Sequence, residues 1–269
     1  MIKIQTLSWN GLDKLKVLRA SLQPALNDLD YEWLIRDNAS TDGTVEEIST
    51  WGDKVKVFPY PHNKDNFAQG MNYLFDQANP KDDDYILLLN NDVIINDTHS
   101  IKNMISIMEN DPDVGAVGAK LLYTNTNKIQ HCGVVFHNHH QTPTHFKVGQ
   151  EATKIDSQNR EFQVVTGAVL LIRSIDFKNV GLMDPNFRWA FCDVDLCLSI
   201  KYNLNKKIVY CGQTNIYHEE SASLKKNPVN KLFMPHNIQY FMKKWRGKYK
   251  LDENDYMKNP NLNLYRAPK

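Results

Sequence analysis

The sequence is poor in cysteine and in excess charge, and each shortage excludes a class of protein. Four of the 269 residues are cysteines and none forms a C-x-x-C pair, so their spacing does not predict a zinc site. Each cysteine lies beside apolar residues, which is typical of small buried thiols in a reducing, cytoplasmic compartment. The 32 basic and 31 acidic side chains leave a net charge of +1 and no general attraction to nucleic acid.

Long apolar runs are also missing. No segment approaches the roughly 18 consecutive apolar residues that a membrane-spanning helix needs. The chain begins with strand-like alternation and not with the pattern of a signal peptide. We therefore expect a cytoplasmic protein with at most peripheral contact at the inner face of a membrane. The sequence does not indicate the oligomeric state.

Strand and helix patterns alternate over residues 1–120. Short apolar segments typical of strands lie at 2–7, 31–36, 55–58, 86–89 and 114–117. Between them, apolar residues recur at helical spacing, most clearly as Ile101, Met104, Ile105 and Met108. This alternation predicts an α/β fold with a mostly parallel central sheet flanked by helices.

Beyond residue 120 the pattern changes. The segments 130–136 and 164–172 are typical of strands, and a last amphipathic helix is expected around 238–245. The polar, His-rich segment 137–160 predicts a long surface loop, and its histidines match no metal motif. We expect 259–269 to be a poorly ordered tail. A basic cluster lies near the end of the sequence and consists of Lys243, Lys244, Arg246, Lys248 and Lys250. We interpret it as a solvated helix face in preference to the alternative, contact with an anionic membrane surface or an acceptor diphosphate.

The run from Tyr85 to Asp92 is the most informative segment. Five apolar or aromatic residues are followed by Asn90, Asn91 and Asp92, which predicts a strand buried on both faces that ends in polar groups. Open α/β sheets bind ligands beyond such strand ends, and a carboxylate there suits Mg²⁺ or Mn²⁺ shared with phosphates. Taken alone, a polar strand exit is the favoured interpretation.

Two further segments carry carboxylates. The segment from Asp37 to Gly43 follows the second strand. A turn with a helix N-cap explains most of this segment. Asp37, at the strand end, could instead accept a hydrogen bond from the N–H of a nucleotide base. In the second, Asp193 and Asp195 lie between apolar neighbours. Buried carboxylates need a partner or a role, so one of these two is a candidate general base, with N-cap duty as the alternative.

In this order, the segments resemble the inverting family 2 glycosyltransferases with a GT-A fold, especially their rhamnosyltransferase-like branch. The resemblance covers roughly residues 1–245 and rests on segments in the family's order: 8–11, 37–43, 66–72, 90–92, 166–168, 181–184, 192–197 and His218. It implies a single GT-A domain over 1–245. The nucleotide-sugar half would be 1–120, the acceptor and catalytic half 121–245, and 246–269 a C-terminal extension.

The resemblance also implies roles for individual residues. Asp193 would be the general base of a metal-dependent inverting transfer, and Asp92 with His218 would hold Mn²⁺ or Mg²⁺. The donor, of dTDP-rhamnose or UDP-hexose type, would be bound by Thr6, Ser8, Asn10, Asp37, Asn66, Gly70, Asn91 and Asp92. The acceptor, a glycan or lipid-linked glycan, would lie by Gly167, Trp189 and Asp195. Trp189 is equally interpretable as a core residue, and Asp195 could instead orient a neighbouring side chain.

Two departures from the family pattern keep alternatives open. Asn90 replaces the first acidic residue of a strict D-x-D motif, and Cys192 replaces the usual Glu before the base. Both leave room for an inactive nucleotide- or glycan-binding GT-A module. A sugar-phosphate nucleotidylyltransferase is a weaker alternative, because it needs a Gly-rich basic loop after the first strand and 8–11 holds one glycine.

Overall fold

Strands and helices alternate through the first part of the computed structural model, which describes residues 1–188, 190–219 and 232–268. In chain order the elements are β1 (Ile2–Ser8), α1 (Leu12–Ala25), β2 (Tyr31–Asn38), α2 (Thr44–Ile48), β3 (Val55–Tyr60), α3 (Phe67–Ala78), β4 (Tyr85–Leu89), β5 (Val93–Ile95), α4 (Ser100–Asn110) and β6 (Val114–Tyr123). The predicted apolar helix faces are confirmed, since Leu15, Leu18 and Leu22 of α1 are all fully buried.

The second part is less regular. Its elements are β7 (Ile129–His131), β8 (Val134–Phe136), β9 (Pro143–His145), the 3-10 helix η1 (Lys154–Ser157), β10 (Arg160–Phe162), β11 (Val169–Arg173), α5 (Ser174–Asn179), α6 (Cys192–Asn203), β12 (Lys207–His218), α8 (Met234–Trp245) and α9 (Glu253–Lys258). The predicted strand 130–136 is therefore two strands, with a break at Cys132 and Gly133 where the backbone of Gly133 is left-handed (φ 106°).

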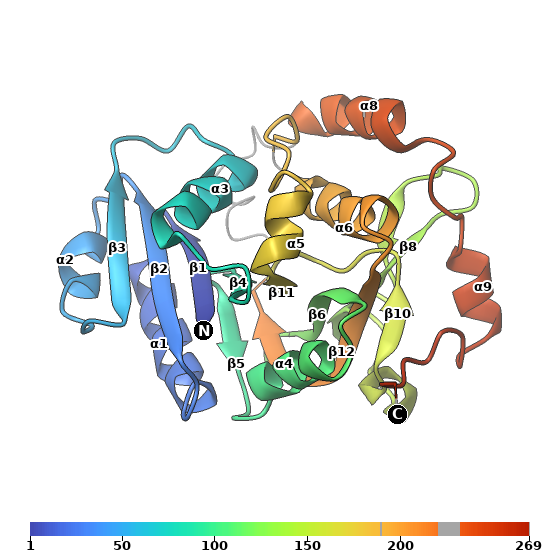
Figure 1. The fold of residues 1–269 in the computed structure, drawn as a ribbon, viewed down its shortest axis with the longest axis horizontal. Helices are drawn as coiled ribbons and strands as arrows, with labels where there is room; N and C mark the ends of the chain where they lie inside the picture. The colour runs from blue at the N-terminus through green and yellow to red at the C-terminus, as the bar shows by residue number, and fades with distance from the viewer. Residues whose placement is uncertain (189, 220–231, 269) are drawn as a thin grey trace.

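The main sheet has the strand order β10-β12-β6-β11-β4-β1-β2-β3 (Figure 1). The strands β1, β2, β3 and β4 are mutually parallel, and β6 with β12 forms another parallel pair. Between these two groups, β11 runs antiparallel to both β4 and β6. Since two antiparallel steps restore the direction, β6 and β12 run the same way as β1, which confirms a mostly parallel sheet.

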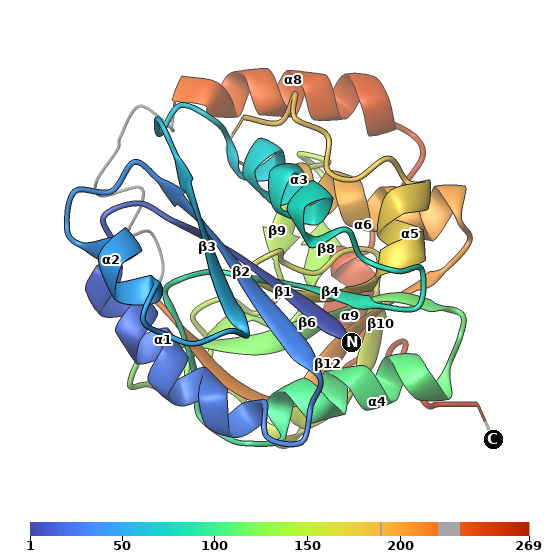
Figure 2. The same cartoon turned by 60° about the vertical axis from the view of Figure 1, so that its left-hand side comes forward.

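The central strand β4 is buried on both faces, as its apolar run predicts. Leu87 and Leu89 belong to the buried cluster on one side of the sheet, and Ile86 and Leu88 belong to the cluster on the other side. Two layers of helices supply these clusters (Figure 2): α1 and α4 cover one face, and α3, α5 and α6 cover the other. The polar residues after Leu89 therefore emerge from the core at the sheet's edge.

Two predictions about irregular segments need correction. The segment 137–160 is not a plain loop, because β9 pairs with β8 and η1 follows it. The described part of the expected tail, 259–268, is attached to β10, where the backbone N–H of Glu161 donates to Asn263 at 2.9 Å and Tyr265 donates back to Asn159 at 2.9 Å. Before it, Tyr256 of α9 is buried in the core, so the extension packs on the domain.

Candidate active site

A cleft of about 1060 Å³ opens where β1, β2 and β4 end. Ser8 and Asn38 are the last residues of their strands, Asn90 directly follows β4, and all three line the cleft. Because these strands are parallel, their carboxyl ends meet at one edge, where open α/β sheets bind ligands. Later parts of the chain complete the walls with residues 166–168, 190–194 and His218.

Asp37 and Ser8 are paired in register across β1 and β2, and each holds a buried polar atom without a hydrogen-bond partner in the described residues. The Asp37 Oδ2 accepts from the backbone N–H of Ser40 at 2.9 Å, whereas its Oδ1 accepts nothing there. A buried acceptor left in that state costs roughly 1–3 kcal/mol. The local turn thus explains one carboxylate oxygen of Asp37 and leaves the other without a partner in the described residues.

Asn10 and Asn66 are used by the fold itself. Asn10 joins the loops after β1 and β2, because its Oδ1 accepts from the Thr41 N–H at 2.8 Å and its own N–H donates to Ser40 Oγ at 2.8 Å. Asn66 caps α3 in a reciprocal box with Gln69, and its Nδ2 donates to the carbonyl of Pro185 at 2.7 Å. Asn66 and Asn91 line the cleft, and their contact with a donor stays a prediction.

Thr6 and Gly70 are not among the residues that line the cleft, and their contact with a donor stays a prediction. Thr6 is fully buried and its hydroxyl accepts from the indole N–H of Trp33 at 2.9 Å. A Cβ on Gly70 would lie 2.6 Å from Leu7 Cδ1, so the absence of a side chain lets α3 pack closely on β1. Both residues therefore support the strand that carries Ser8.

Asp92 and His218 come together from distant parts of the chain. The short strand β5 pairs with the end of β12 so that Val93 lies opposite His218, and Asp92 Oδ1 lies 3.1 Å from His218 Nε2. Among the residues that the structure describes, no group of three or more His, Cys, Asp or Glu side chains could hold a metal ion. A cation that shares its ligands with substrate phosphates needs only one or two carboxylates, so the pair fits part of such a site.

Asp193 lies in the first turn of α6, is partly buried and lines the cleft. Its Oδ2 accepts from the backbone N–H of Gly167 at 2.9 Å and its Oδ1 accepts from the N–H of Val194 at 2.9 Å. A Cβ on Gly167 would lie 3.0 Å from the Asp193 Cβ, so glycine there permits this close approach. Two backbone donors thus hold the carboxylate in one orientation at the cleft wall.

The two residues just before Asp193 are a left-handed phenylalanine and a buried cysteine. Phe191, the N-cap of α6, has a left-handed backbone (φ 73°), which non-glycine residues adopt at a cost of about 1–3 kcal/mol. Cys192, in the position of the family's Glu, is buried, and burial raises the pKa of its thiol well above the ordinary value. A protonated, buried thiol is no nucleophile.

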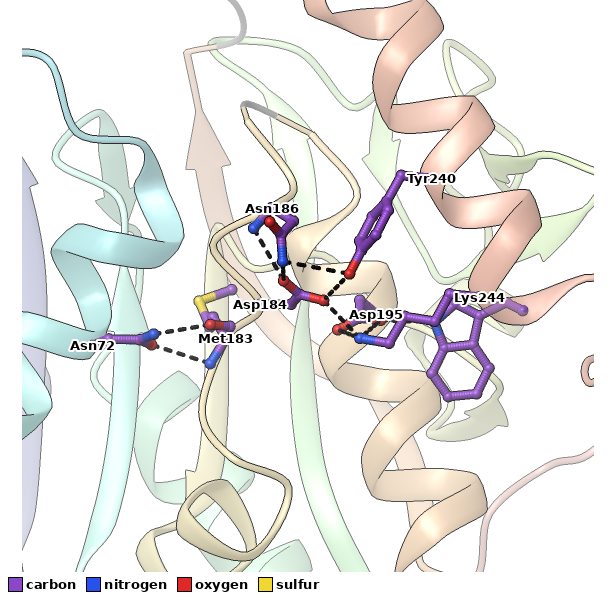
Figure 3. Close-up of polar contacts among 8 residues, drawn as sticks. Asn72, Met183, Asp184, Asn186, Asp195, Tyr240 and Lys244 are labelled. Atoms are coloured by element: carbon purple, nitrogen blue, oxygen red, sulfur yellow. Dashed lines mark hydrogen bonds and ion pairs between the residues drawn. The ribbon is translucent and has the colours of Figure 1, made fainter.

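Asp195 is not among the residues that line the cleft, and its place on the acceptor side stays a prediction. It is 3% exposed and faces α8: its Oδ1 accepts from the Trp245 indole N–H at 2.7 Å, and Lys244 Nζ lies 2.8 Å from it. Lys244 also lies 2.8 Å from Asp184 Oδ2, to which Tyr240 donates at 3.0 Å (Figure 3). Lys244 therefore joins two carboxylates and is not on the solvated face predicted for it.

The pKa values of the two carboxylates that share Lys244 are shifted in opposite directions. Burial raises the pKa of Asp195 above its ordinary value, despite the hydrogen bonds from Lys244 and Trp245. Burial acts the same way on Asp184, but hydrogen bonds from Lys244 and Asn186 outweigh it and hold that pKa below the ordinary value.

Asn72 of α3 forms hydrogen bonds with both the carbonyl and the N–H of Met183 (Figure 3). The segment at Met183 and Asp184, which leads to the cleft wall, is therefore held by α3 on one side and by Lys244 of α8 on the other.

Lys14 and Trp9 are among the cleft residues to which the sequence analysis gave no role. Lys14, in the first turn of α1, lines the cleft with its Nζ 3.8 Å from Asp92 Oδ2 and 2.9 Å from Glu219. Trp9 lines the cleft and is 36% exposed, unusual for its size. For Trp9, the available signal was its place directly after the first strand, whereas Lys14 lies further on, in the first turn of the next helix. Trp189, predicted on the acceptor side, lies outside the described residues.

Comparisons with known proteins give a matching family model and two relatives in sequence. The family model described as Glycosyl transferase family 2 matches residues 9–176. An uncharacterised protein, y4gI, of Sinorhizobium fredii is 29% identical over 94% of the chain, and the O-antigen biosynthesis protein RfbC of Myxococcus xanthus is 28% identical over 81% of it. The chain spans only 28% and 17% of the lengths of these two relatives.

Solved structures share the fold at low sequence identity. The mannosyltransferase PcManGT of Pyrobaculum calidifontis, with GDP-Man and Mn²⁺, has a TM-score of 0.66 at 12% identity, covering 95% of this chain and 69% of that one. GalNAc-T7 with UDP, GalNAc and Mn²⁺ has a TM-score of 0.62 at 12% identity, covering 91% and 56%. Residues 1–349 of S. aureus TarS, with UDP-GlcNAc, have a TM-score of 0.58 at 15% identity, covering 81% and 58%. The predicted GT-A fold is confirmed.

None of the described helices is long and apolar enough to cross a membrane.

Proposed function

The chain belongs to glycosyl transferase family 2, and from that premise we propose that it transfers a sugar from a nucleoside-diphosphate donor to an acceptor hydroxyl with inversion at the anomeric carbon. One observation carries this proposal: a single cleft holds both the oriented carboxylate of Asp193 and the Asp92–His218 pair. An inverting sugar transferase needs a base that accepts the acceptor's proton. It also needs, in the same site, groups that stabilise the negative charge of the departing diphosphate.

The nucleoside would bind at the ends of β1 and β2. The unpartnered Oδ1 of Asp37 suits the N3–H of a pyrimidine, which uracil and thymine share. Ser8, next to it in register, offers a hydroxyl, and Trp9 offers an exposed ring for stacking. These contacts support a UDP or dTDP donor.

The diphosphate would lie by Asn91, Asp92 and His218. The residues fit a shared Mn²⁺ or Mg²⁺, with Asp92 and His218 as its protein ligands. A divalent cation bound there would neutralise charge that develops on the departing diphosphate. Lys14 places a further positive charge beside Asp92, so part of this stabilisation comes from the chain itself.

Asp193 would act as general base. As the acceptor oxygen forms its bond to the anomeric carbon, the bond to the nucleoside diphosphate breaks with its electron pair, and the acceptor proton passes to a carboxylate oxygen of Asp193. Gly167 and Val194 hold that carboxylate through backbone N–H donors, which orients it without protonating it. A positioned base of this kind contributes about 10²–10⁴-fold in rate.

For the substrates, we propose a donor of dTDP-rhamnose or UDP-hexose type and a glycan or lipid-linked glycan acceptor. The rhamnosyltransferase-like order of motifs supports the donor, and the relative described as an O-antigen biosynthesis protein supports a polysaccharide acceptor. An inactive binding module is the competing proposal, but it would not require a carboxylate oriented at the cleft wall.

A panel of nucleotide sugars tests the proposal. The purified chain is incubated with UDP-, dTDP- and GDP-sugars, and released nucleoside diphosphate is measured without metal, with EDTA, and after restoring Mn²⁺ or Mg²⁺. We expect slow donor hydrolysis with one nucleotide class, stopped by EDTA and restored by the cation. Full turnover in EDTA would contradict the metal role. Tight binding of a donor with no turnover under any condition, acceptor glycans included, would favour the inactive module.

A further inference from the structure

Gln130 of β7 makes two contacts with one residue, His218. Its Oε1 lies 2.5 Å from the ring Nδ1 of His218, and its Nε2 donates to the backbone carbonyl of His218 at 2.9 Å. Gln130 is 4% exposed, so both ends of its amide are committed inside the protein. Neither contact belongs to the sheet's own backbone pairing.

These two contacts indicate that Nδ1 of the His218 ring carries a proton. The carbonyl of His218 accepts only, so the Gln130 end that faces it must be the NH₂ group. The other end, which faces the ring, must then be the amide oxygen, and an oxygen at 2.5 Å requires a proton on Nδ1. The backbone of His218 thus orients Gln130, and Gln130 in turn orients the ring.

Nε2 of His218 has two polar neighbours, one a donor and the other an acceptor. Asn90 Nδ2 lies 3.3 Å from Nε2 and can donate to a lone pair there. Asp92 Oδ1 lies 3.1 Å from the same nitrogen. In the neutral Nδ1–H tautomer, a carboxylate lone pair and an imidazole lone pair face one another across that gap, an arrangement that a cation between them would stabilise.

We propose that Gln130 is a positioning residue: it holds His218 in the Nδ1–H tautomer, so that Nε2 is presented beside Asp92 as a metal ligand. This inference rests on the metal site of the proposed function and names the residue that prepares it. Ligand histidines ordinarily donate their second N–H to such a partner, and replacing the partner costs about 10–100-fold in metal affinity. It also gives Asn90 a role: it contacts the ligand nitrogen where the strict motif has a carboxylate.

The wild-type protein, free of metal, allows a direct measurement. Long-range ¹H–¹⁵N spectra of its histidine rings, recorded at about pH 8 and so above the usual imidazole pKa of about 6.5, distinguish the two neutral tautomers. The spectrum of His218→Ala identifies the His218 signals. We expect an Nδ1–H ring at His218. An Nε2–H ring, or an imidazolium that persists at this pH, would overturn the proposal whatever the variants do.

Three variants then test the consequence by Mn²⁺ titration calorimetry in the presence of UDP. Gln130→Leu keeps the size of the side chain and removes both contacts, so we expect Mn²⁺ to bind 10–100-fold more weakly. Gln130→Glu keeps an acceptor toward Nδ1 and should recover most of the affinity. Gln150→Leu makes the same exchange on the exposed segment after β9 and should bind Mn²⁺ as the wild type does. Equal affinity in Gln130→Leu and wild type would contradict the proposal.

The same titration separates this inference from the proposed function. If His218→Ala binds Mn²⁺ as tightly as the wild type, the metal site itself is wrong. If His218→Ala loses the ion while Gln130→Leu retains it, only the role of Gln130 is wrong.

Discussion

Replacing Lys244 by methionine removes the cation that Asp184 and Asp195 share, and the structure sets the size of the effect. The side chain of Asp195 is 4% exposed and that of Asp184 is 15% exposed, whereas that of Lys244 is 34% exposed. Removing one partner of a fully buried pair costs about 3–5 kcal/mol. Because the ammonium is partly hydrated, and Trp245 and Tyr240 still donate to the two carboxylates, we expect a loss of about 2–3 kcal/mol in the free energy of unfolding.

Urea unfolding followed by circular dichroism measures this loss. With a slope of about 3 kcal/mol per M, the midpoint should fall by about 1 M. The matched control is Lys243→Met, one residue earlier on α8, where the lysine is exposed and the change should stay within about 0.5 kcal/mol. If the two variants lost the same stability, or if neither lost any, Lys244 would not connect α8 to α6 and to the segment that begins at Asp184.

Three further changes have expected outcomes. Burial lowers the pKa of His131 well below its ordinary value, so as the pH falls the unfolded chain takes up a proton before the folded protein does. The free energy of unfolding should therefore decrease below about pH 6.5 by up to ~1.4 kcal/mol per pH unit. His131→Gln should flatten this pH dependence, whereas His140→Gln, at an exposed position, should leave it unchanged in urea unfolding curves recorded over a range of pH. Gly167→Ala places a Cβ 3.0 Å from that of Asp193 and should lower turnover by about 10²-fold with nucleotide affinity kept; unchanged turnover would show that the position of the carboxylate is not critical. Asp37→Ala should weaken UDP or dTDP binding in calorimetry by about 10-fold or more, and equal binding would rule out base recognition by this residue.

The parts of the fold that follow from local pattern could be predicted from the sequence. The apolar run of β4 had no polar residue to turn toward water, so its burial on both faces followed directly. The helices α1 and α4 carry apolar residues at helical spacing, and they lie where the pattern predicts. The cleft follows from the parallel strands, because Ser8, Asn38 and Asn90 all end strands that point the same way.

The parts that depend on distant contacts do not follow from local sequence patterns. The approach of His218 to Asp92 was expected only from the family resemblance, because it requires β5, a strand of three residues, to pair with the end of β12, and so short a segment has no readable pattern. Thr6 has a polar side chain in a strand that leads to the site, yet the indole of Trp33 occupies its hydroxyl. Lys244 looks like one of several surface lysines until α8 is placed against Asp184 and Asp195.

The same limit applies to the interpretation of motifs. Asp193 and Asp195 are two residues apart in the same helix turn, and composition alone does not distinguish them. In the structure Asp193 faces the cleft and Asp195 faces α8, so only one of them can receive a proton from an acceptor. Phe191, which precedes them, has a left-handed backbone that no spacing rule predicts.

The most direct test of the central claim is the turnover of Asp193→Asn with the active donor and an acceptor. Asparagine keeps the size of the side chain and an oxygen for the Gly167 N–H, but it cannot take a proton from the acceptor hydroxyl. We predict that kcat/KM falls by about 10²–10⁴-fold while calorimetry shows the nucleotide bound as in the wild type. Turnover near the wild-type rate would contradict the account, because the cleft would then transfer sugar without the base that we propose for it.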